Sequence, residues 1–284
     1  MFCIQVGRRS RLVSAFACGL SLLLCTILLR NFSSATRAVS CTKYFDAKGR
    51  NWPDKVNPIR HVVFINLASR TDRLVSINHE LRAARLQGRR LAAENVRNNT
   101  NLLRDCWSNS SLDVSRCAGQ LGCQMSHIQA LELAERSGWD HVAIFEDDFE
   151  WGEGVEPLLF QYNIASLMAA VGEWDVIAIS VKLVRGEAFE PKTTFDLGRN
   201  KTAVLKRIIE AQTTHGYIVR AGYIPRVLKT FRACDVRRGY WTAIDTCWKH
   251  LQLDDKWFAF DPQLGTQAKG FSDIEQKQVS YMIQ

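Results

Sequence analysis

Several patterns that define common protein classes are missing from this sequence. It has no Gly-X-Y period, no internal repeat and no long Pro- or Ser-rich tract, which excludes collagens, solenoids and low-complexity arrays. A Walker A loop, a GxSxG elbow, an HExxH helix and a GxGxxG turn are also absent. The sequence therefore does not favour a P-loop NTPase, a serine hydrolase, a zincin or a Rossmann dinucleotide-binding enzyme. No CxxC pair or Cys/His spacing indicates a zinc site.

The composition is that of an ordinary folded chain of 284 residues. Hydrophobic residues make up 46% and charged residues 23%, which is typical of globular proteins rather than disordered ones. The net charge of +8 invites a nucleic-acid partner, but the Lys and Arg residues are scattered and form no basic helix interleaved with aromatics. No nucleic-acid partner is therefore expected. The basic balance suits a membrane-flanking segment and a site for anionic phosphates.

An uncharged apolar stretch, Leu12–Leu29, lies near the N-terminus between three arginines and Arg30. As a helix it spans roughly 27 Å, enough for a thin bilayer such as that of the endoplasmic reticulum. A cleaved signal peptide has a shorter apolar core and a small-residue cleavage site, so an uncleaved signal anchor is the favoured interpretation. The preceding arginines place the N-terminus in the cytoplasm and the remainder in the lumen. A cleaved leader on a secreted enzyme is the alternative.

This interpretation divides the chain into four parts. The predicted boundaries are a cytoplasmic tail at 1–11, a transmembrane helix at 12–29, a stem at 30–58 and a lumenal catalytic domain at 59–284. We therefore expect a single-pass type II protein of the Golgi or endoplasmic reticulum membrane.

Sequons and cysteines agree with a lumenal location. The sequons lie at Asn31, Asn98, Asn109 and Asn200, and each is a glycosylation acceptor only in a secreted context. Cysteines after the anchor are even in number, and an oxidising lumen permits disulfides. The nearest spacings are Cys106–Cys117 and Cys234–Cys247, with Cys123 competing for the first pair.

Apolar periodicity predicts alternating strands and helices. Strands are expected at 62–67, 141–145, 175–180 and 213–219, and helices at 71–84, 122–136, 155–171 and 226–231, with a loop at 95–116. This alternation predicts an α/β fold with a mainly parallel sheet that helices cover on both faces. Ligands of such sheets bind beyond the carboxyl ends of the strands.

The most informative segment is Val142–Glu150, where a hydrophobic strand runs straight into Glu146, Asp147 and Asp148. Three adjacent carboxylates repel one another unless they are solvated or a divalent cation neutralises them. Alternation along an extended chain places Glu146 and Asp148 on one side and Asp147 on the other. Two oxygen donors on one side suit Mn²⁺ or Mg²⁺. An acidic turn at a strand end is the alternative.

Four segments, in order, are similar to one enzyme family. They are Ile65-Asn66-Leu67-x-x-Arg70-x-x-Arg73, Gly122-Cys123-x-x-Ser126-His127, Phe145-Glu146-Asp147-Asp148 and His215-Gly216-Tyr217-Ile218-Val219. Their order and spacing resemble glycosyltransferase family 25, which includes bacterial lipooligosaccharide galactosyltransferases and animal procollagen galactosyltransferases. The resemblance implies a GT-A fold, a nucleotide-sugar donor, usually UDP-galactose, and a DxD-like metal site. Here that site reads Glu-Asp-Asp, with Glu146 and Asp148 as the expected metal ligands.

The resemblance also places the residues after the first strand beside the nucleotide. Asn66 is expected to hydrogen-bond the uracil or ribose, and Arg70 or Arg73 to reach a phosphate. Asp147, which lies between the two expected metal ligands, is assigned to the same nucleotide-sugar site. The alternative is that Asn66 only ends a strand and that both arginines face solvent.

Two further segments supply nucleotide-sugar candidates. Gly122 is expected to open a helix, so that Ser126 and His127 lie within its first turns, where a helix N-terminus favours anions. A structural role is the alternative for His127. By the family resemblance, His215 backs the acceptor or sugar pocket.

The catalytic candidate is Asp245, which resembles the family's later acidic position before a helix. Inverting transfer needs a carboxylate that takes the proton from the acceptor hydroxyl as its oxygen attacks the anomeric carbon. An ordinary helix N-cap is the alternative for Asp245.

These features predict a metal-dependent glycosyltransferase that moves galactose or glucose from a UDP-sugar to a hydroxyl of a glycan or protein, with inversion. The expected cofactor is Mn²⁺ or Mg²⁺, and the N-terminal helix is the expected membrane contact. The alternative is a non-catalytic binding or adhesion module with the same fold. Such relatives usually lose acidic ligands, whereas all three carboxylates are present here. Collagen hydroxylysine, a glycoprotein glycan and a lipid-linked sugar all stay open as acceptors.

The acidic cluster leads to a first prediction. Asp148→Asn keeps the shape of the side chain and removes its charge, so it should weaken Mn²⁺ binding and slow UDP-sugar turnover about 10²–10³-fold. Asp147→Asn should cost less, and both variants should fold. Turnover and thermal unfolding of the two proteins are the measurements. Near-full metal-dependent activity of Asp148→Asn would show that the metal ligands are misassigned, as would greater damage from Asp147→Asn.

Overall fold

The computed structural model describes residues 58–109, 112–238 and 243–280. The predicted cytoplasmic tail, the anchor helix and all but the last residue of the stem lie outside these ranges, so their boundaries stay predictions. Within the described ranges, no helix has both the length and the apolar character needed to cross a membrane.

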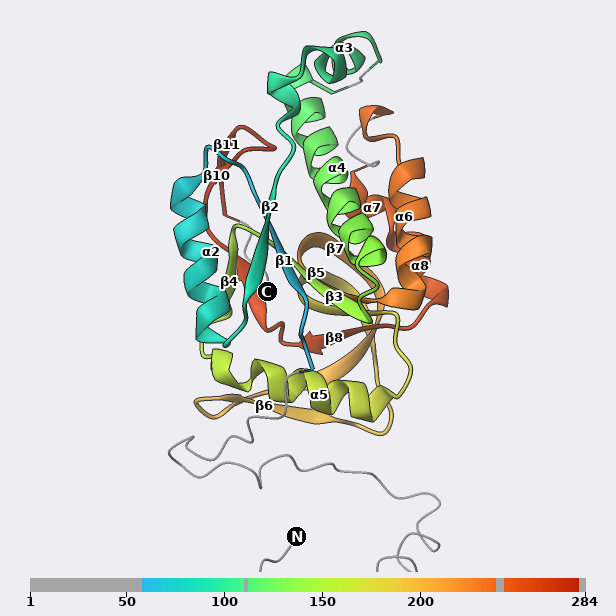
Figure 1. Cartoon of the computed structure of the whole chain (residues 1–284). Helices are drawn as coiled ribbons and strands as arrows, with labels where there is room; N and C mark the ends of the chain where they lie inside the picture. The colour runs from blue at the N-terminus through green and yellow to red at the C-terminus, as the bar shows by residue number, and fades with distance from the viewer. Residues whose placement is uncertain (1–57, 110–111, 239–242, 281–284) are drawn as a thin grey trace, which may run out of the picture. The chain divides into compact units, whose positions relative to one another are not determined.

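A seven-stranded sheet forms the centre of the described part of the chain (Figure 1). Its order is β2-β1-β3-β7-β5-β8, and β6 pairs with β7. The strands are β1 (Val62–Asn66), β2 (Gly88–Ala92), β3 (His141–Glu146), β5 (Val176–Ala188), β6 (Thr194–Gly198), β7 (Lys201–Arg220) and β8 (Trp257–Asp261). The expected strands at 62–67, 141–145, 175–180 and 213–219 correspond to β1, β3, β5 and β7. The sequence did not predict the edge strand β2, because the strand carries two arginines, Arg89 and Arg90, and none of its residues is buried.

The sheet is mixed because β7 is antiparallel to every other strand. β1 is parallel to β2 and β3, and β5 is parallel to β8, whereas β7 is antiparallel to β3, β5, β6 and β8. The reversal occurs in a tight β6–β7 hairpin whose central residues, Arg199 and Asn200, both have positive φ, as the twist of a short hairpin favours. The prediction of a mainly parallel sheet therefore holds for every strand except β7.

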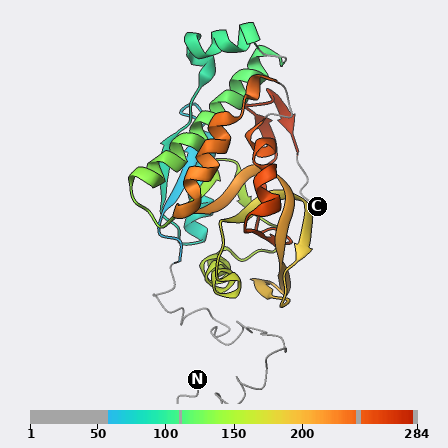
Figure 2. The same ribbon diagram turned by 90° about the vertical axis from the view of Figure 1, so that its right-hand side faces the viewer.

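Helices cover both faces of the sheet, as the sequence predicts. Successive residues of β3 alternate between two cores, with Val142 and Ile144 in one and Ala143 and Phe145 in the other. The first core is closed by α4 (Val114–Arg136), α6 (Ile224–Ala233) and α8 (Lys249–Asp254), and the second by α2 (Thr71–Ala83) and α5 (Phe160–Val171). Figure 1 shows α2 and α5 apart from the group formed by α4, α6 and α8, and Figure 2 again shows α5 apart from α4 and α6.

The remaining elements are short. They are η2 (Val96–Asn98), α3 (Thr100–Asn109), β4 (Phe149–Trp151), η3 (Pro157–Leu159), η4 (Ala221–Tyr223), η5 (Val236–Arg238), α7 (Ile244–Cys247), β9 (Gly265–Gln267), β10 (Gly270–Ser272) and β11 (Lys277–Val279). β4 pairs with β9, and β10 with β11. The C-terminal segment thereby returns to the residues that follow β3.

The predicted loop at 95–116 and the predicted helix start at Gly122 are both wrong. Most of that segment is helical, because α3 occupies Thr100–Asn109 and α4 begins at Val114. Asp113 caps α4 by accepting a hydrogen bond from the backbone NH of Arg116 at 2.9 Å. The start of the helix was not visible in the sequence because Gly119 and Gly122 interrupt its apolar pattern.

The two disulfides of the described residues have the nearest cysteine spacings. Cys106 bonds to Cys117 and joins α3 to α4, and Cys234 bonds to Cys247 and joins the end of α6 to α7. Cys123 is a free thiol. The sequence left the partner of the first pair open, and the structure resolves it in favour of Cys106 and Cys117.

Gly122 provides a test of how closely α4 approaches the chain after β2. A Cβ at this position would lie 2.5 Å from the carbonyl oxygen of Glu94. Although alanine favours a helix by about 1 kcal/mol over glycine, Gly122→Ala should destabilise the protein by about 1–3 kcal/mol through overpacking. Gly270→Ala is the control, because nothing lies within 4 Å of its added Cβ. Thermal unfolding measures both variants, and a stabilised Gly122→Ala protein would contradict the packing described.

Candidate functional site

Strand register brings three polar positions together at the carboxyl ends of β1 and β3. Ile65 of β1 pairs with Glu146 of β3, and Phe145 pairs with Gly216 of the antiparallel β7. The residues just beyond these pairs are therefore neighbours. Asn66 reaches Asp147, and His215 lies beside Glu146. Candidates far apart in the sequence thus share one edge of the buried sheet.

The acidic residues do not lie on one extended strand, as the alternation argument assumed. β3 ends at Glu146, and Asp147 and Asp148 form a turn before β4. The grouping expected from alternation is nevertheless present. Donor atoms of Glu146, Asp148 and His215 all lie within 4.8 Å of one another, whereas Asp147 points to Asn66 and Arg73.

This donor set fits a divalent cation. Asp148 Oδ1 and His215 Nδ1 are buried and have no hydrogen-bond partner among the described residues, and a buried polar atom is costly when left unpaired. Two carboxylates and one imidazole suit Mn²⁺ better than Mg²⁺, which prefers oxygen ligands alone. His215, expected beside the sugar, therefore lies with the predicted metal ligands Glu146 and Asp148.

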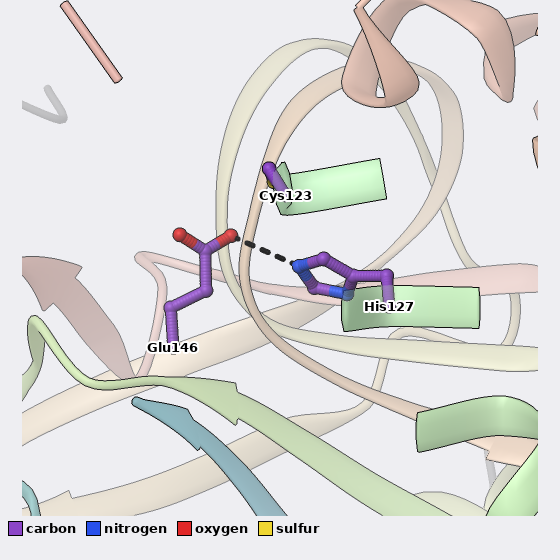
Figure 3. A group of neighbouring side chains, drawn as sticks. All are labelled: Cys123, His127 and Glu146. Atoms are coloured by element: carbon purple, nitrogen blue, oxygen red, sulfur yellow. Dashed lines mark ion pairs between the residues drawn. The ribbon is translucent and has the colours of Figure 1, made fainter. Parts of the chain in front are cut away.

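Glu146 is held by neighbours from two elements, α4 and β7. The Thr214 hydroxyl donates to its Oε1 at 2.6 Å, and His127 Nε2 lies 3.4 Å from the same oxygen (Figure 3). Burial alone would raise the pKa of Glu146, but contact with His127 and the nearby charge of His215 outweigh burial and lower the pKa to about 2. The carboxylate is therefore ionised at neutral pH.

Arg73 offsets the charge of the other two acids. Its Nη1 lies 2.9 Å from Asp147 Oδ1 and 3.1 Å from Asp148 Oδ2. Asn66, which is fully buried, donates to Asp147 Oδ2 at 2.7 Å. Burial, followed by the charge of Asp148, nevertheless raises the pKa of Asp147 to about 6. Through these hydrogen bonds and ion pairs, Asn66 and Arg73 position the acidic turn.

The ion-pair partners of Arg70 differ from those of Arg73. It forms ion pairs with Asp72 and Asp273, and its Nη1 donates to the carbonyl oxygen of Phe271. Arg73 Nη2 donates to the same carbonyl at 2.8 Å. Both arginines therefore hold the C-terminal segment against α2, but of the two only Arg73 lines the cleft described next.

A cleft of about 720 Å³ opens in front of the acidic turn. It is lined by residues of β1, α2, the chain after β2, α4, the end of β3 with its acidic turn, and the C-terminal segment, including Arg73, Asn95, Arg97, Ser126, His127, Glu146, Asp147, Asp148 and Asp273.

Ser126 and His127 lie on the wall of this cleft about three turns inside α4, not at its N-terminus. The argument that a helix N-terminus favours anions there is therefore wrong. The Ser126 hydroxyl donates to the Gly122 carbonyl at 2.7 Å and accepts from the Glu94 NH at 2.9 Å. His127 is 1% exposed, and its Nδ1 is hydrogen-bonded to the Tyr217 hydroxyl at 2.8 Å.

A second cleft, of about 940 Å³, meets the first at Glu146. Both clefts share Cys123, Glu146, Gln267, Ser272 and Ile274, and the second is lined in addition by Lys182, Thr213, Thr214, His215 and Asp245, among others. The junction of the two clefts therefore coincides with the candidate metal ligands.

Asp245 lies in the second cleft and does not cap its helix. The cap residue of α7 is Ala243, and Asp245 Oδ2 accepts from the backbone NH of Thr213 at 3.2 Å. Burial raises the pKa of Asp245. An aspartate with a raised pKa is a stronger base than an exposed one, which suits proton transfer.

Sequence reasoning missed two residues that contact the acids. Gln267, on β9, donates to Asp148 Oδ2 at 3.0 Å. Nothing in the sequence assigned it a role. Thr214 has no sequence signal, since its contact with Glu146 depends on the register between β3 and β7.

Comparison with known proteins identifies the class. The family described as Glycosyltransferase family 25 (LPS biosynthesis protein) matches residues 59–248. The match spans more than half of the chain, which therefore belongs to glycosyltransferase family 25. No curated protein matches it.

Some solved structures are similar over most of their length. Apo UDP-glucose pyrophosphorylase is 10% identical with a TM-score of 0.39, and UDP-glucose pyrophosphorylase complexed with UDP-glucose is 11% identical with a TM-score of 0.37. Each alignment covers 74% of this chain and 90% of the other. The similarity is remote, so the assignment rests on the family match.

The contact between Thr214 and Glu146 can be tested directly. Thr214→Val keeps the branched shape and removes the hydroxyl that orients the carboxylate, so Mn²⁺ affinity should fall about 10–100-fold. Thr194→Val, at an exposed position of β6 outside both clefts, should leave affinity unchanged. Paramagnetic resonance of free Mn²⁺ during a titration gives the affinities. Equal affinities for the two variants would remove Thr214 from the site.

Proposed function

We propose that this chain is a metal-dependent hexosyltransferase of glycosyltransferase family 25. It transfers galactose, or glucose, from a UDP-sugar to a hydroxyl group of a glycan or protein, with inversion. The observation that carries the proposal is the junction of two clefts at Glu146, with an acidic, arginine-lined wall on one side and Asp245 on the other. Donor and acceptor sites of a transferase need this adjacency.

The first cleft suits the donor. Its wall carries the guanidinium groups of Arg73 and Arg97 as well as the acidic turn, and arginine recognises phosphate by paired hydrogen bonds. Glu146, Asp148 and His215 are the residues that would hold Mn²⁺. When bound, the cation neutralises the diphosphate and stabilises UDP as the leaving group. Arg73 would exchange its contacts with Asp147 and Asp148 for the phosphates.

The second cleft suits the acceptor. Asp245 takes the proton of the acceptor hydroxyl while the oxygen of that hydroxyl forms a bond to the anomeric carbon. The bond from that carbon to the UDP oxygen breaks, and UDP leaves with the bonding electrons. Attack from the face opposite UDP inverts the anomeric centre. The Thr213 NH, which donates to Asp245 Oδ2, orients the carboxylate.

The cellular setting of the proposal is the secretory pathway. The described part of the chain holds two disulfides, which is typical of an oxidising compartment. Together with the expected signal anchor and sequons, they support a lumenal domain in the Golgi or endoplasmic reticulum. UDP-sugar donors and glycan or glycoprotein acceptors are the partners proposed there.

A panel of UDP-sugars tests the activity. The purified full chain with Mn²⁺ should release UDP from UDP-galactose or UDP-glucose, and chelation should abolish the release. A folded protein that turns over none of these donors would overturn the proposal. Tight UDP binding that requires Mn²⁺ would argue against the non-catalytic module considered above, whereas binding of a glycan or protein without any nucleotide affinity would support it.

The role of Asp245 has its own test. Asp245→Asn should lower kcat by about 10²–10⁴-fold and leave the KM for the donor nearly unchanged, since the residue lies in the other cleft. Because burial raises the pKa of Asp245, wild-type kcat should fall as pH drops through a value above that of an ordinary aspartate. Asp254→Asn, at the exposed end of α8, is the control. Undiminished kcat in Asp245→Asn would eliminate it as the base.

A further inference from the structure

Cys123 lies at the junction of the two clefts as a free thiol. It is half-buried and lines both clefts. The neighbouring Cys117 of α4 is bonded to Cys106, and Cys247 of α7 is bonded to Cys234. The proposed transfer reaction assigns no role to this sulfur.

The imidazole ring of His127 is directed at Glu146, which lies at the same junction of the two clefts. Cys123 and His127 are one turn apart on α4, so their side chains project from one face of the helix. Figure 3 shows both next to Glu146, with the imidazole ring directed at the carboxylate. The hydrogen bond between Nδ1 and Tyr217 fixes the ring. Nε2 is buried and makes no hydrogen bond within the described residues, and Glu146 Oε1 lies 3.4 Å away.

The three side chains have the spacing of a metal site. Donor atoms of Cys123, His127 and Glu146 all lie within 4.8 Å of one another. A tetrahedral Zn²⁺ with ordinary bond lengths holds its donors about 3.3–3.8 Å apart, so small side-chain rotations close the set. A ligating histidine is usually fixed through its other ring nitrogen, as Tyr217 does here. All three side chains line the first cleft.

We propose that Cys123, His127 and Glu146 bind a thiophilic divalent cation of the Zn²⁺ class. Sulfur and imidazole ligands select such cations, whereas the set of Glu146, Asp148 and His215 is richer in oxygen and suits Mn²⁺. The two sets share Glu146. Binding of the thiophilic cation therefore removes Glu146 from the Mn²⁺ set and inhibits the enzyme, a consequence that rests on the proposed function.

The competing explanation needs no cation. In it, His127 and Glu146 form a simple ion pair, and Cys123 only packs between α4 and the cleft. Burial and the charge of Glu146 raise the pKa of the Cys123 thiol, so a cation must displace the thiol proton in order to bind. The two explanations differ in whether the sulfur bonds directly to an added metal.

Co²⁺ reports on that bond, because a Co²⁺–thiolate pair has a near-ultraviolet charge-transfer band. The metal-free full chain should develop the band on titration with Co²⁺, and Zn²⁺ should abolish it. Cys123→Ser, a nearly isosteric change, should remove the band, whereas Asp148→Asn, which alters only the other set, should retain it. Thermal unfolding checks that both variants fold. Absence of the band in the wild type, or an undiminished band in Cys123→Ser, would overturn the proposed site.

Competition with Mn²⁺ tests the shared ligand. Zn²⁺ should displace Mn²⁺ from the wild type, measured by paramagnetic resonance of the released ion, and Cys123→Ser should need at least about tenfold more Zn²⁺. Equal Zn²⁺ requirements would refute the competition. A Co²⁺ band in a protein that turns over no UDP-sugar would uphold the site and reject the transferase. Turnover without the band would do the reverse.

Discussion

Three adjacent carboxylates at the end of a buried strand are the constraint on which the site depends. Glu146, Asp147 and Asp148 cannot all ionise in a partly buried place without compensation, because like charges in a poorly solvated environment repel strongly. The fold supplies Arg73 and Asn66 for the turn, and Thr214 and His127 for Glu146. These contacts still leave Asp148 Oδ1 and His215 Nδ1 without partners in the described residues. In the function proposed above, a divalent cation completes the compensation.

The antiparallel strand β7 makes this arrangement possible. It carries Thr213, Thr214 and His215 to the carboxyl end of β3 from the opposite direction, so one short segment contacts the acid at the junction and Asp245 in the second cleft. Arg70 and Arg73 then fasten the C-terminal segment at Phe271 over the same place. The two clefts meet at one carboxylate because these segments converge there.

The sequence foretold the parts of this arrangement that depend on local pattern. The buried run before Glu146 predicted β3, and helical spacing predicted α2, α5 and α6. The sequence could not predict features that depend on tertiary contacts. The early start of α4 depends on the Asp113 cap and a disulfide. The roles of Thr214 and Gln267 depend on strand register and on strand β9. The motifs named Asp148 and His215 separately, but only the fold brings them within one donor set. Arg70, named for a phosphate, instead pairs with Asp72 and Asp273.

The central claim is that Glu146, Asp148 and His215 hold the cation that binds the diphosphate of the donor. Anomalous diffraction from crystals grown with UDP and Mn²⁺ tests it most directly. The account predicts a single strong Mn²⁺ peak among these three side chains, with UDP in the first cleft and its diphosphate between the cation and Arg73. A peak elsewhere, or UDP bound outside this cleft, would contradict the account.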